Sequence, residues 1–371
     1  MSKNQKYKVS LFAHRENTNL IWNDLESCLF QLSENEIDLL EKIELSQELD
    51  RTDINAGEDQ SFHSLLEKGL IIPVLEREDG KFKLKRVDIE TVSHCNAKCL
   101  YCPQSIHKRP KGIMSNDFFR EILKRLEHEK PDWIATAHFG EPLLDPGFEK
   151  KVEMLSNHDH RYLFFTNASL LTKERLSFLA TQNIHSAFFN FPSLNKSEWA
   201  YFMQLPEKQF NMAKNGIAKF ANMLDGKLEE IGIVVNGITE NQVQRVEKIK
   251  KYFQDYGNIR VLKCESNSRA GAIKNNMVTQ YVNDQKYFYG CDYPVSELNI
   301  TINGDCILCC HDYYREIVLG NIMSKSIREI TQSETANYLR AEIFGQRPMR
   351  KKLLCRMCDR IRKERKVILS T

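Results

Sequence analysis

The chain has 371 residues, of which 42% are hydrophobic and 28% charged, a composition typical of a folded globular protein rather than a disordered or fibrous one. The formal net charge of +3 gives no general argument for a nucleic-acid partner. The longest apolar stretches, such as 69–75 and 231–235, are too short to cross a membrane, and the first ten residues lack a following apolar secretion core. We therefore expect a cytoplasmic protein with no membrane partner.

The first eighty residues differ in charge from the rest. Residues 1–79 hold 8 Lys and Arg against 17 Asp and Glu, a balance of −9, which leaves +12 for residues 80–371. The predicted elements of this region are strands over 7–13, 19–23 and 70–75, and helices over 33–43 and 60–68. Ser33 and Glu36 form a capping box, and Gly69 stops the second helix. We interpret residues 1–80 as a winged-helix-like module, either a structural or dimerising appendage or a dock for a peptide, with a linker at Asp79-Gly80.

Strand and helix patterns alternate regularly over residues 84–275. The predicted strands cover 87–92, 133–138, 162–165, 187–191, 231–236 and 259–263. Helices are predicted over 116–127, opened by Ser115, over 148–155, opened by Asp145 and Pro146, and over 173–180, opened by Thr172. Six βα units predict an α/β fold, a partial (β/α)6 TIM-like barrel whose chemistry lies at the C-terminal ends of the strands.

The pattern changes over residues 286–371. A β-hairpin is predicted from 298–302, the Asn303-Gly304 turn and 306–310, followed by a helix over 327–342. The tail from Gly345 holds ten Lys and Arg against two acidic residues. It is either a solvated helix or a contact for the acidic first module, and nucleic acid is not favoured because aromatic residues are not interleaved with the basic ones.

Three cysteines follow the first barrel strand. Cys95, Cys99 and Cys102 form a CxxxCxxC motif, and clustered thiols in a reducing compartment indicate metal binding. Three thiolates on one short loop can hold three irons of a cubane cluster and leave the fourth iron open for a ligand. The alternative is a structural zinc loop, for which His94 and His107 lack the usual ligand spacing.

The motif resembles that of the radical S-adenosylmethionine (radical SAM) superfamily, in which an aromatic residue precedes the last cysteine, as Tyr101 does here. The resemblance implies an open [4Fe-4S] cluster on Cys95, Cys99 and Cys102 that binds SAM. It also implies a 5′-deoxyadenosyl radical that abstracts hydrogen from a substrate, with a reductant such as flavodoxin or ferredoxin as partner.

Further segments carry the same resemblance at later strand ends. His138–Pro146 resembles the family's GGE-type segment for the methionine amino group, with Phe139 in place of the first Gly, and Thr166-Asn167 resembles its TN segment. Asn190 and Asn236 stand where ribose contacts are expected. The cofactor-binding residues implied are Tyr101, Gly140, Glu141, Pro142, Thr166 and Asn167.

Six more cysteines lie in the last quarter of the chain. Their spacing resembles the single-cluster twitch form of the SPASM-type extension, which implies a closed auxiliary [4Fe-4S] cluster on Cys291, Cys309, Cys355 and Cys358 and favours electron transfer. Strand parity does not decide between Cys309 and Cys310, and we choose Cys309 on family spacing. A zinc site is the alternative.

The resemblance implies a radical SAM oxidoreductase that oxidises or cross-links its substrate. A ribosomally made precursor peptide is favoured because the first module resembles peptide-recognition elements. The alternatives are a dehydrogenase of a small sugar or aminocyclitol, and a non-enzymic metal-binding partner protein. Catalytic side chains stay unassigned: Cys264 is either a hydrogen donor or a small buried residue, and His311 and Asp312 are either acid-base groups or, as we expect, solvated loop residues.

Overall fold

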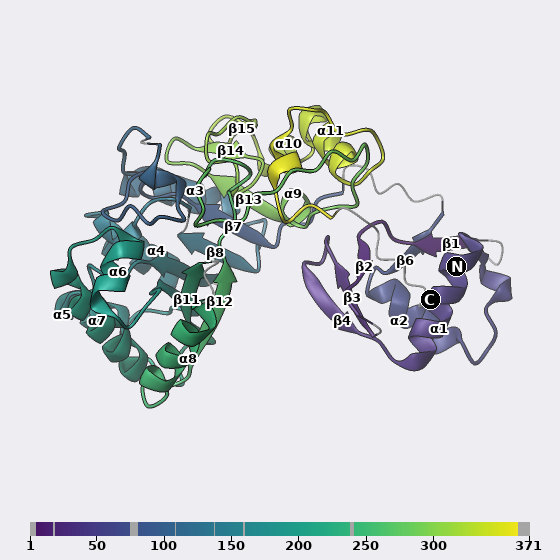
Figure 1. Cartoon of the computed structure of the whole chain (residues 1–371). Helices are drawn as coiled ribbons and strands as arrows, with labels where there is room; N and C mark the ends of the chain where they lie inside the picture. Colours follow the sequence, from purple (N-terminus) through teal and green to yellow (C-terminus); the bar gives the residue numbers. More distant parts are fainter. Residues whose placement is uncertain are drawn as a thin grey trace.

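A computed structural model describes residues 5–362 except 18, 75–80, 108, 137, 159 and 238–240. The expected linker Asp79-Gly80 and the basic residues beyond 362 lie outside the described residues. Two bodies are visible, a large α/β body and a small N-terminal module beside its C-terminal segments (Figure 1). Among the helices described, none combines the length and apolar character needed to traverse a bilayer.

The N-terminal module contains two small antiparallel sheets and two helices. Their order is β2-β3-β4 in one sheet and β5-β1-β6 in the other. The elements are β1 (Lys6–Val9), β2 (Ala13–Arg15), β3 (Leu20–Asn23), β4 (Cys28–Gln31), α1 (Glu34–Ser46), β5 (Leu49–Asp50), α2 (Asp59–Glu67) and β6 (Ile71–Pro73). The Ser33–Glu36 capping box is present at the start of α1. Gly69, at φ +64°, adopts the left-handed turn that ends α2.

The large body is built on a curved sheet in which the six predicted barrel strands are parallel neighbours. They are β7 (Arg86–Ile89), β8 (Trp133–Thr136), β9 (Arg161–Thr166), β10 (Ser186–Asn190), β11 (Glu230–Gly237) and β12 (Ile259–Glu265). The full order is β12-β11-β10-β9-β8-β7-β13-β14-β15. The fold is therefore an open, partial TIM-like barrel, as predicted from the alternating pattern.

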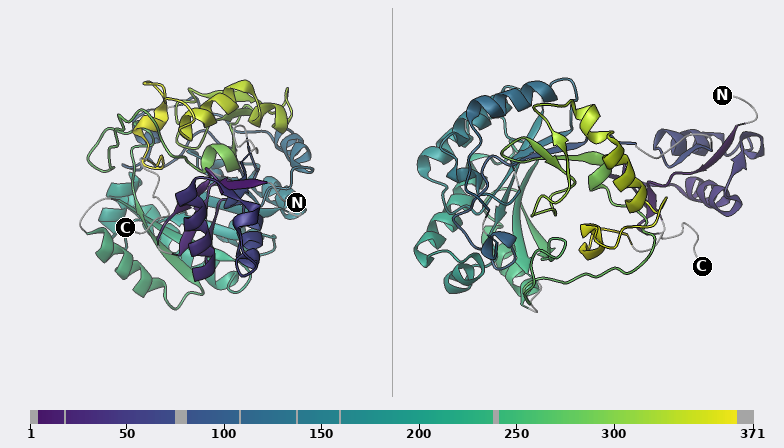
Figure 2. Two further views of the ribbon diagram at one scale, coloured as in Figure 1. Left: turned by 90° about the vertical axis from the view of Figure 1, so that its right-hand side faces the viewer. Right: turned by 90° about the horizontal axis from the view of Figure 1, so that it is seen from above.

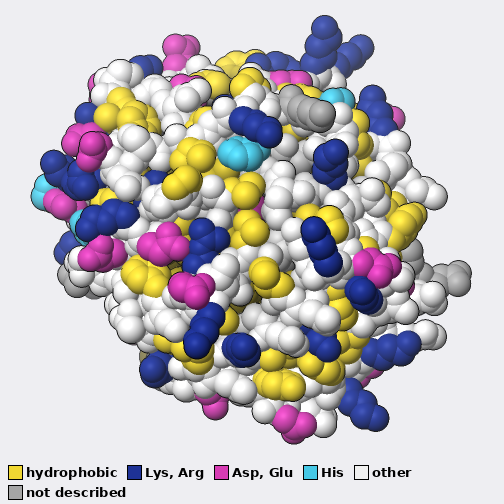
Figure 3. All heavy atoms as spheres, turned by 90° about the vertical axis from the view of Figure 1, so that its left-hand side faces the viewer, with side chains coloured by type: hydrophobic (Ala, Val, Ile, Leu, Met, Phe, Trp, Pro, Cys, Tyr) yellow, Lys and Arg dark blue, Asp and Glu magenta, His cyan; other side chains and the backbone are white. Residues whose placement is uncertain are grey.

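Helices cover the outer face of this sheet (Figure 2). They are α3 (Asn116–Leu126), α4 (Phe148–Ser156), α5 (Lys173–Leu179), α6 (Lys196–Met203), α7 (Phe210–Met223) and α8 (Gln242–Phe253). Ser115 and Thr172 cap α3 and α5 as expected, whereas the cap of α4 is Gly147, whose N–H is bound by the Asp145 carboxylate. On the helix-covered face shown in Figure 3, acidic and basic side chains are interspersed, which does not favour a polyanionic partner there.

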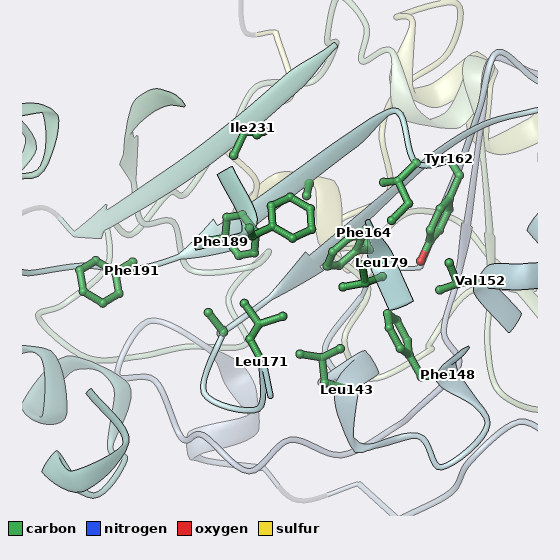
Figure 4. Packing of buried hydrophobic residues seen from close by; sticks show 14 of the residues in the cluster. Leu143, Phe148, Val152, Tyr162, Phe164, Leu171, Leu179, Phe189, Phe191 and Ile231 are labelled. Carbon is green, nitrogen blue, oxygen red and sulfur yellow. The ribbon is translucent and has the colours of Figure 1, made fainter. Parts of the chain in front are cut away.

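Strand parity separates two very different faces of the sheet. The outward side chains are apolar and pack against the helices in the main core, where Tyr162, Phe164, Phe189 and Ile231 lie among residues of the surrounding helices and loops (Figure 4). The inward side chains of β7 are Arg86, Asp88 and, just beyond the strand, Glu90. The inner face is therefore polar at this side of the barrel, which suits a binding site rather than a packed core.

The C-terminal region adds to the sheet and then covers its inner side. Its elements are α9 (Tyr293–Ser296), β13 (Glu297–Ile300), β14 (Asp305–Ile307), β15 (Val318–Asn321), α10 (Ile327–Thr331) and α11 (Glu334–Ile343). The predicted hairpin is β13-β14, but its first strand also pairs in parallel with β7. The single helix expected over 327–342 is wrong, because Ser333 caps a second helix after a break at Gln332.

Candidate active site

The loop after β7 brings three thiols together. Cys99 is buried, while Cys95 and Cys102 are half-buried, and α6 braces the loop through a hydrogen bond from the Lys98 N–H to the Met203 carbonyl at 3.1 Å. Burial raises the pKa of Cys99 well above its usual value, and the charges of Cys102 and Cys95 add to the rise. Burial and the charge of Glu141 raise the pKa of Cys95 to about 12. Such thiols become thiolates only beside a strong cationic centre, which iron supplies.

Two asparagines from neighbouring strand ends point their amides at these sulfurs. Asn167 Nδ2 lies 3.7 Å from Cys95 Sγ, and Asn190 Nδ2 lies 3.7 Å from Cys99 Sγ. Amide N–H groups at this distance stabilise negative charge on sulfur. The donor set and its surroundings therefore fit a three-cysteine iron–sulfur cluster.

Tyr101 is held by a network that includes residues of β10 and β11. Its hydroxyl donates to Asn190 Oδ1 at 3.0 Å, and Asn236 Nδ2 donates to the same oxygen at 3.1 Å. The Met203 thioether lies 3.3 Å from the Tyr101 hydroxyl and 3.7 Å from Cys99 Sγ. Met203 escaped sequence analysis because a single methionine at a helix end carries no signal. The network fixes the motif's aromatic residue against the barrel.

The Gly140-Glu141-Pro142 segment connects three strand ends. The Glu141 carboxylate accepts hydrogen bonds from the Thr166 hydroxyl at 2.6 Å and from the Asn167 N–H at 2.8 Å. Burial raises its pKa, while these bonds oppose that rise. A Cβ on Gly140 would lie 1.8 Å from the Val92 carbonyl oxygen, so only glycine fits there. The structure thus brings the expected cofactor segments to one edge of the barrel, next to Cys95.

The second cysteine set lies in the C-terminal region. Cys291, Cys309, Cys355 and Cys358 are all buried within one cluster that also contains Phe288. Burial raises the pKa of each of these thiols, and for Cys291 the charges of Asp292 and of the other three cysteines add to the rise. Four buried thiols that oppose one another's ionisation again fit a cationic metal centre.

Cys309 and Cys310 follow β14 and face different surroundings. The charges that act on Cys309 include those of Cys355 and Cys358, whereas those acting on Cys310 come from Glu297, Arg269, Asp88 and Arg86. Cys310 therefore faces the inner side of the barrel. Cys306 is fully buried in the main core cluster, and not in the cluster that holds the second cysteine set.

The spacing of the sulfurs bears on the zinc alternative. Thiolates around one zinc ion lie about 3.8 Å apart, because Zn–S bonds are about 2.3 Å long and tetrahedral. Among the described residues, the group of three ligand atoms within 4.8 Å of one another is His311, Cys358 and Asp359, and neither cysteine set forms such a group. Sulfurs spread more widely suit a cluster whose cysteines bind different irons.

His311 and Asp312 are not solvated loop residues, and that expectation is wrong. Both are 3% exposed, since this segment turns back into the protein beside the second cysteine set. His311 Nδ1 lies 3.2 Å from Cys358 Sγ, and the Asp312 carboxylate accepts the N–H groups of Glu316 and Ile317 at 2.9 Å each. Cys264 is half-buried and pairs in register with Asn236, so its side chain shares the inner face at the end of β12.

The segment from Cys309 to Tyr313 joins the two cysteine sets. Tyr313 packs edge-on against Phe139 with ring centroids 4.8 Å apart, its hydroxyl donates to the His107 carbonyl, and its ring belongs to a small cluster that Cys102 contacts. Five residues therefore connect the auxiliary thiols to the first cysteine loop. Sequence analysis missed Tyr313, because the contact depends on how the hairpin folds back across the barrel.

An open barrel with a three-cysteine loop at one strand end and a four-cysteine set on its inner side defines an iron–sulfur enzyme of the radical-generating class. Residues 89–248 match the family model of the radical SAM superfamily, and residues 291–359 match that of the SPASM iron–sulfur cluster-binding domain. The chain belongs to the radical SAM superfamily and carries a C-terminal SPASM domain.

Individual relatives are distant. The S-adenosyl-L-methionine-dependent 2-deoxy-scyllo-inosamine dehydrogenase of Niallia circulans is 24% identical over 279 residues, covering 74% of this chain and 92% of the relative. Streptococcus suis SuiB bound to precursor peptide SuiA superposes with a TM-score of 0.53 at 13% identity, covering 90% of both chains. Native anSMEcpe with bound AdoMet superposes with a TM-score of 0.51 at 17% identity, covering 70% of this chain and 83% of that one. These likenesses to solved structures show the fold.

Membership makes the protein an enzyme that uses a [4Fe-4S] cluster, SAM and auxiliary iron–sulfur chemistry, not a non-enzymic metal-binding partner. When bound, the cluster and SAM would supply a 5′-deoxyadenosyl group that can remove hydrogen from a substrate. The residues of the chain hold, orient and shield these groups.

Proposed function

We propose that the protein oxidises or cross-links a ribosomally made precursor peptide. In this proposal Cys95, Cys99 and Cys102 hold the SAM-binding cluster, and one auxiliary cluster sits on Cys291, Cys309, Cys355 and Cys358. When bound there, the first cluster and SAM would supply a group that removes one hydrogen atom from the substrate, and the auxiliary cluster would supply an acceptor for the second electron. The proposed modules are 1–80, 84–275 and 286–371.

The observation that carries the peptide assignment is the N-terminal module. The short strand β5 forms one edge of the sheet β5-β1-β6. The hollow beside α1 and β5 is lined by Asp38, Glu41, Lys42, Leu45, Ser46 and Leu49. Leu45 is 66% exposed. An extended peptide can add to such a strand edge, with apolar side chains on the leucines and basic ones near the carboxylates. SuiB, which was solved with its precursor peptide, is similar in fold over 90% of this chain.

A small aminocyclitol is the second candidate. The inosamine dehydrogenase aligns over 92% of its own length but over only 74% of this chain. It therefore leaves about a quarter of this chain unmatched, and a small substrate gives that quarter no role.

The first test measures 5′-deoxyadenosine release from SAM under anaerobic, reducing conditions. We expect release from the reconstituted protein and none from the Cys95/Cys99/Cys102→Ala variant. Candidate precursor peptides are then added, and we expect the substrate peptide to lose two hydrogens, measured by mass spectrometry.

The role of the module is tested by Leu45→Asp, which places a charge in the hollow without touching either cysteine set. We expect peptide turnover to fall at least tenfold while release of 5′-deoxyadenosine without peptide is unchanged. Full turnover by Leu45→Asp, or modification of 2-deoxy-scyllo-inosamine and not of the peptide, would exclude the peptide assignment.

A further inference from the structure

Two surface segments, residues 282–289 and 346–357, are bonded to each other beside the second cysteine set. The Arg356 guanidinium joins them by donating to the Asn283 carbonyl at 2.9 Å. In return, the Asn283 N–H donates to the Arg356 carbonyl at 2.8 Å, and the Asn283 side-chain amide donates to the Cys358 carbonyl at 3.3 Å. The two segments therefore form one surface that is bonded to the backbone of the second cysteine set.

This surface carries an unbalanced positive charge. The two segments together hold six Lys and Arg and a single acidic residue, Asp284. Four of these cations form no ion pair with the described residues, namely Lys286, Arg347, Lys351 and Lys352. The three lysines among them are exposed, so their charge faces solvent and attracts an acidic partner.

Exposed apolar side chains lie among the cations. Tyr287 is 41% exposed and Met357 is 39% exposed. Met357 ends the 3₁₀ turn Leu354–Met357, which holds Cys355 and leads into Cys358, and each of these cysteines is only 7% exposed. A partner that covers Met357 therefore lies against the turn that carries both buried thiols. Tyrosine, methionine and arginine are also the residue types that are enriched in protein interfaces.

The tyrosines at this surface favour a protein partner over a nucleic acid. The Arg347 guanidinium carbon lies 3.7 Å from the centroid of the Tyr338 ring, and Lys286 Nζ lies 5.3 Å from the centroid of the Tyr287 ring. Single-stranded nucleic acids bind by stacking bases on open aromatic faces. Here a cation already occupies one face of each ring.

We propose that this surface is the docking site of a small acidic electron-carrier protein. We call it the basic face and define it by Lys286, Tyr287, Arg347, Lys351, Lys352 and Met357. A carrier docked there lies beside the proposed auxiliary cluster and would accept one electron from it, so that the cluster is oxidised and the carrier is reduced by one electron. Transient redox complexes have small interfaces, which suits a face built from two short segments. The inference rests on the proposed auxiliary cluster but not on which substrate is oxidised.

The first experiment measures docking on the reconstituted full-length protein. The probes are oxidised flavodoxin and a [2Fe–2S] ferredoxin, two small acidic carriers, and surface plasmon resonance follows their association at low and high salt. We expect Lys351→Glu/Lys352→Glu to slow association at least about tenfold at low salt and to remove most of its salt dependence, because opposite charges steer the encounter. The matched control is Lys248→Glu/Lys251→Glu, which changes the same number of charges at exposed positions of α8, and it should slow association less than about twofold.

Three results of this experiment would overturn the proposal. Equal slowing in both variants would mean that only the net charge matters. Failure of both carriers to bind the unmodified protein would leave the face without the partner proposed. Single-stranded RNA that binds more tightly than either carrier, with the same dependence on Lys351 and Lys352, would assign the face to nucleic acid.

The second experiment follows the electron. In the Cys95/Cys99/Cys102→Ala background, the protein is reduced with dithionite, excess reductant is removed, and stopped-flow absorbance records the reduction of the added carrier. We expect Lys351→Glu/Lys352→Glu to slow this step at least about tenfold, with the α8 control unchanged. A carrier that docks but accepts no electron would show that the face is not an electron-transfer site.

Peptide oxidation, measured in parallel, separates this inference from the proposed function. Docking and electron transfer without any peptide turnover would leave the basic face in place and remove the peptide function. Peptide turnover combined with carriers that ignore Lys351 and Lys352 would remove the basic face alone.

Discussion

Gly140 marks the tightest packing among the cofactor segments. Because an added Cβ would meet a backbone oxygen at 1.8 Å, Gly140→Ala has to move β7 or the loop after β8. We expect a loss of about 3 kcal/mol in the free energy of unfolding, with little iron retained by the first cysteine set. Urea unfolding and iron analysis check this. Gly57→Ala, whose Cβ would meet only Asn55 Oδ1 at 3.2 Å, should be nearly neutral.

We predict that His311 tunes the reduction potential of the proposed auxiliary cluster. A Cys358 thiolate bound to iron would carry no proton, so the 3.2 Å contact would then require the His311 Nδ1–H to donate to the sulfur. Such a bond stabilises the reduced, more negative state, and His311→Ala should therefore lower the reduction potential of the auxiliary cluster.

Redox titration followed by electron paramagnetic resonance in the Cys95/Cys99/Cys102→Ala background isolates that cluster. His311→Asn, which keeps a donor near the sulfur, should recover part of the potential. An unchanged potential in His311→Ala would show that the contact has no electronic role.

At the scale of single elements, the start of α1 is stabilised by the carboxylate of Glu36, whose ionisation depends on pH. Burial tends to raise the pKa of Glu36, but hydrogen bonds from Lys68, Ser64 and Ser33 outweigh it and lower that pKa to about 2. The ionised carboxylate therefore stabilises the module above pH 4.5, and this stabilisation, at most about 3 kcal/mol, is lost as pH falls from about 4.5 to 2. Unfolding of Glu36→Gln should show a flatter dependence on pH over that window, measured by circular dichroism.

Elements with a strong local signal were predictable from the sequence. The six barrel strands and the start of α1 follow from apolar alternation and capping residues. The pairing of β13 with β7 was not predictable, since Leu298 and Ile300 read equally well as part of an isolated hairpin. The two-residue β5 is too short to leave a pattern. At the site, spacing within each cysteine motif was informative, but the burial of His311 and the orientation of Cys310 toward the barrel interior depend on which segment folds over β14.

At the scale of the whole molecule, one buried carboxylate connects the N-terminal module to the C-terminal region. Asp24 is 0% exposed; its oxygens accept Arg362 Nη1 at 2.7 and 2.8 Å, and Oδ2 lies 2.9 Å from His14 Nε2. Asp24→Asn removes the negative charge that these partners face and should lower the free energy of unfolding by about 3 kcal/mol. We also expect faster hydrogen exchange around Phe12 and Phe344, whose rings are in contact.

Glu26→Gln is the control at the same boundary. Glu26 pairs with Lys83 and Lys85 and keeps 27% of its side chain exposed, so its loss should cost less than that of Asp24, about 1 kcal/mol. Equal hydrogen exchange in both variants would mean that Asp24 does not hold the module in place.

The neighbour of the first barrel strand comes from far along the chain. Glu297 pairs with Arg86, a separation of 211 positions (297 minus 86). A ribosome adding about 5–20 residues per second needs about 10–40 seconds to synthesise that stretch of chain. During this time the edge of β7 that later pairs with β13 is unpaired, although the cysteine loop after β7 has already been synthesised. Nascent chains stalled before β13 should therefore aggregate or recruit chaperones, and the order of translation sets when the barrel can close.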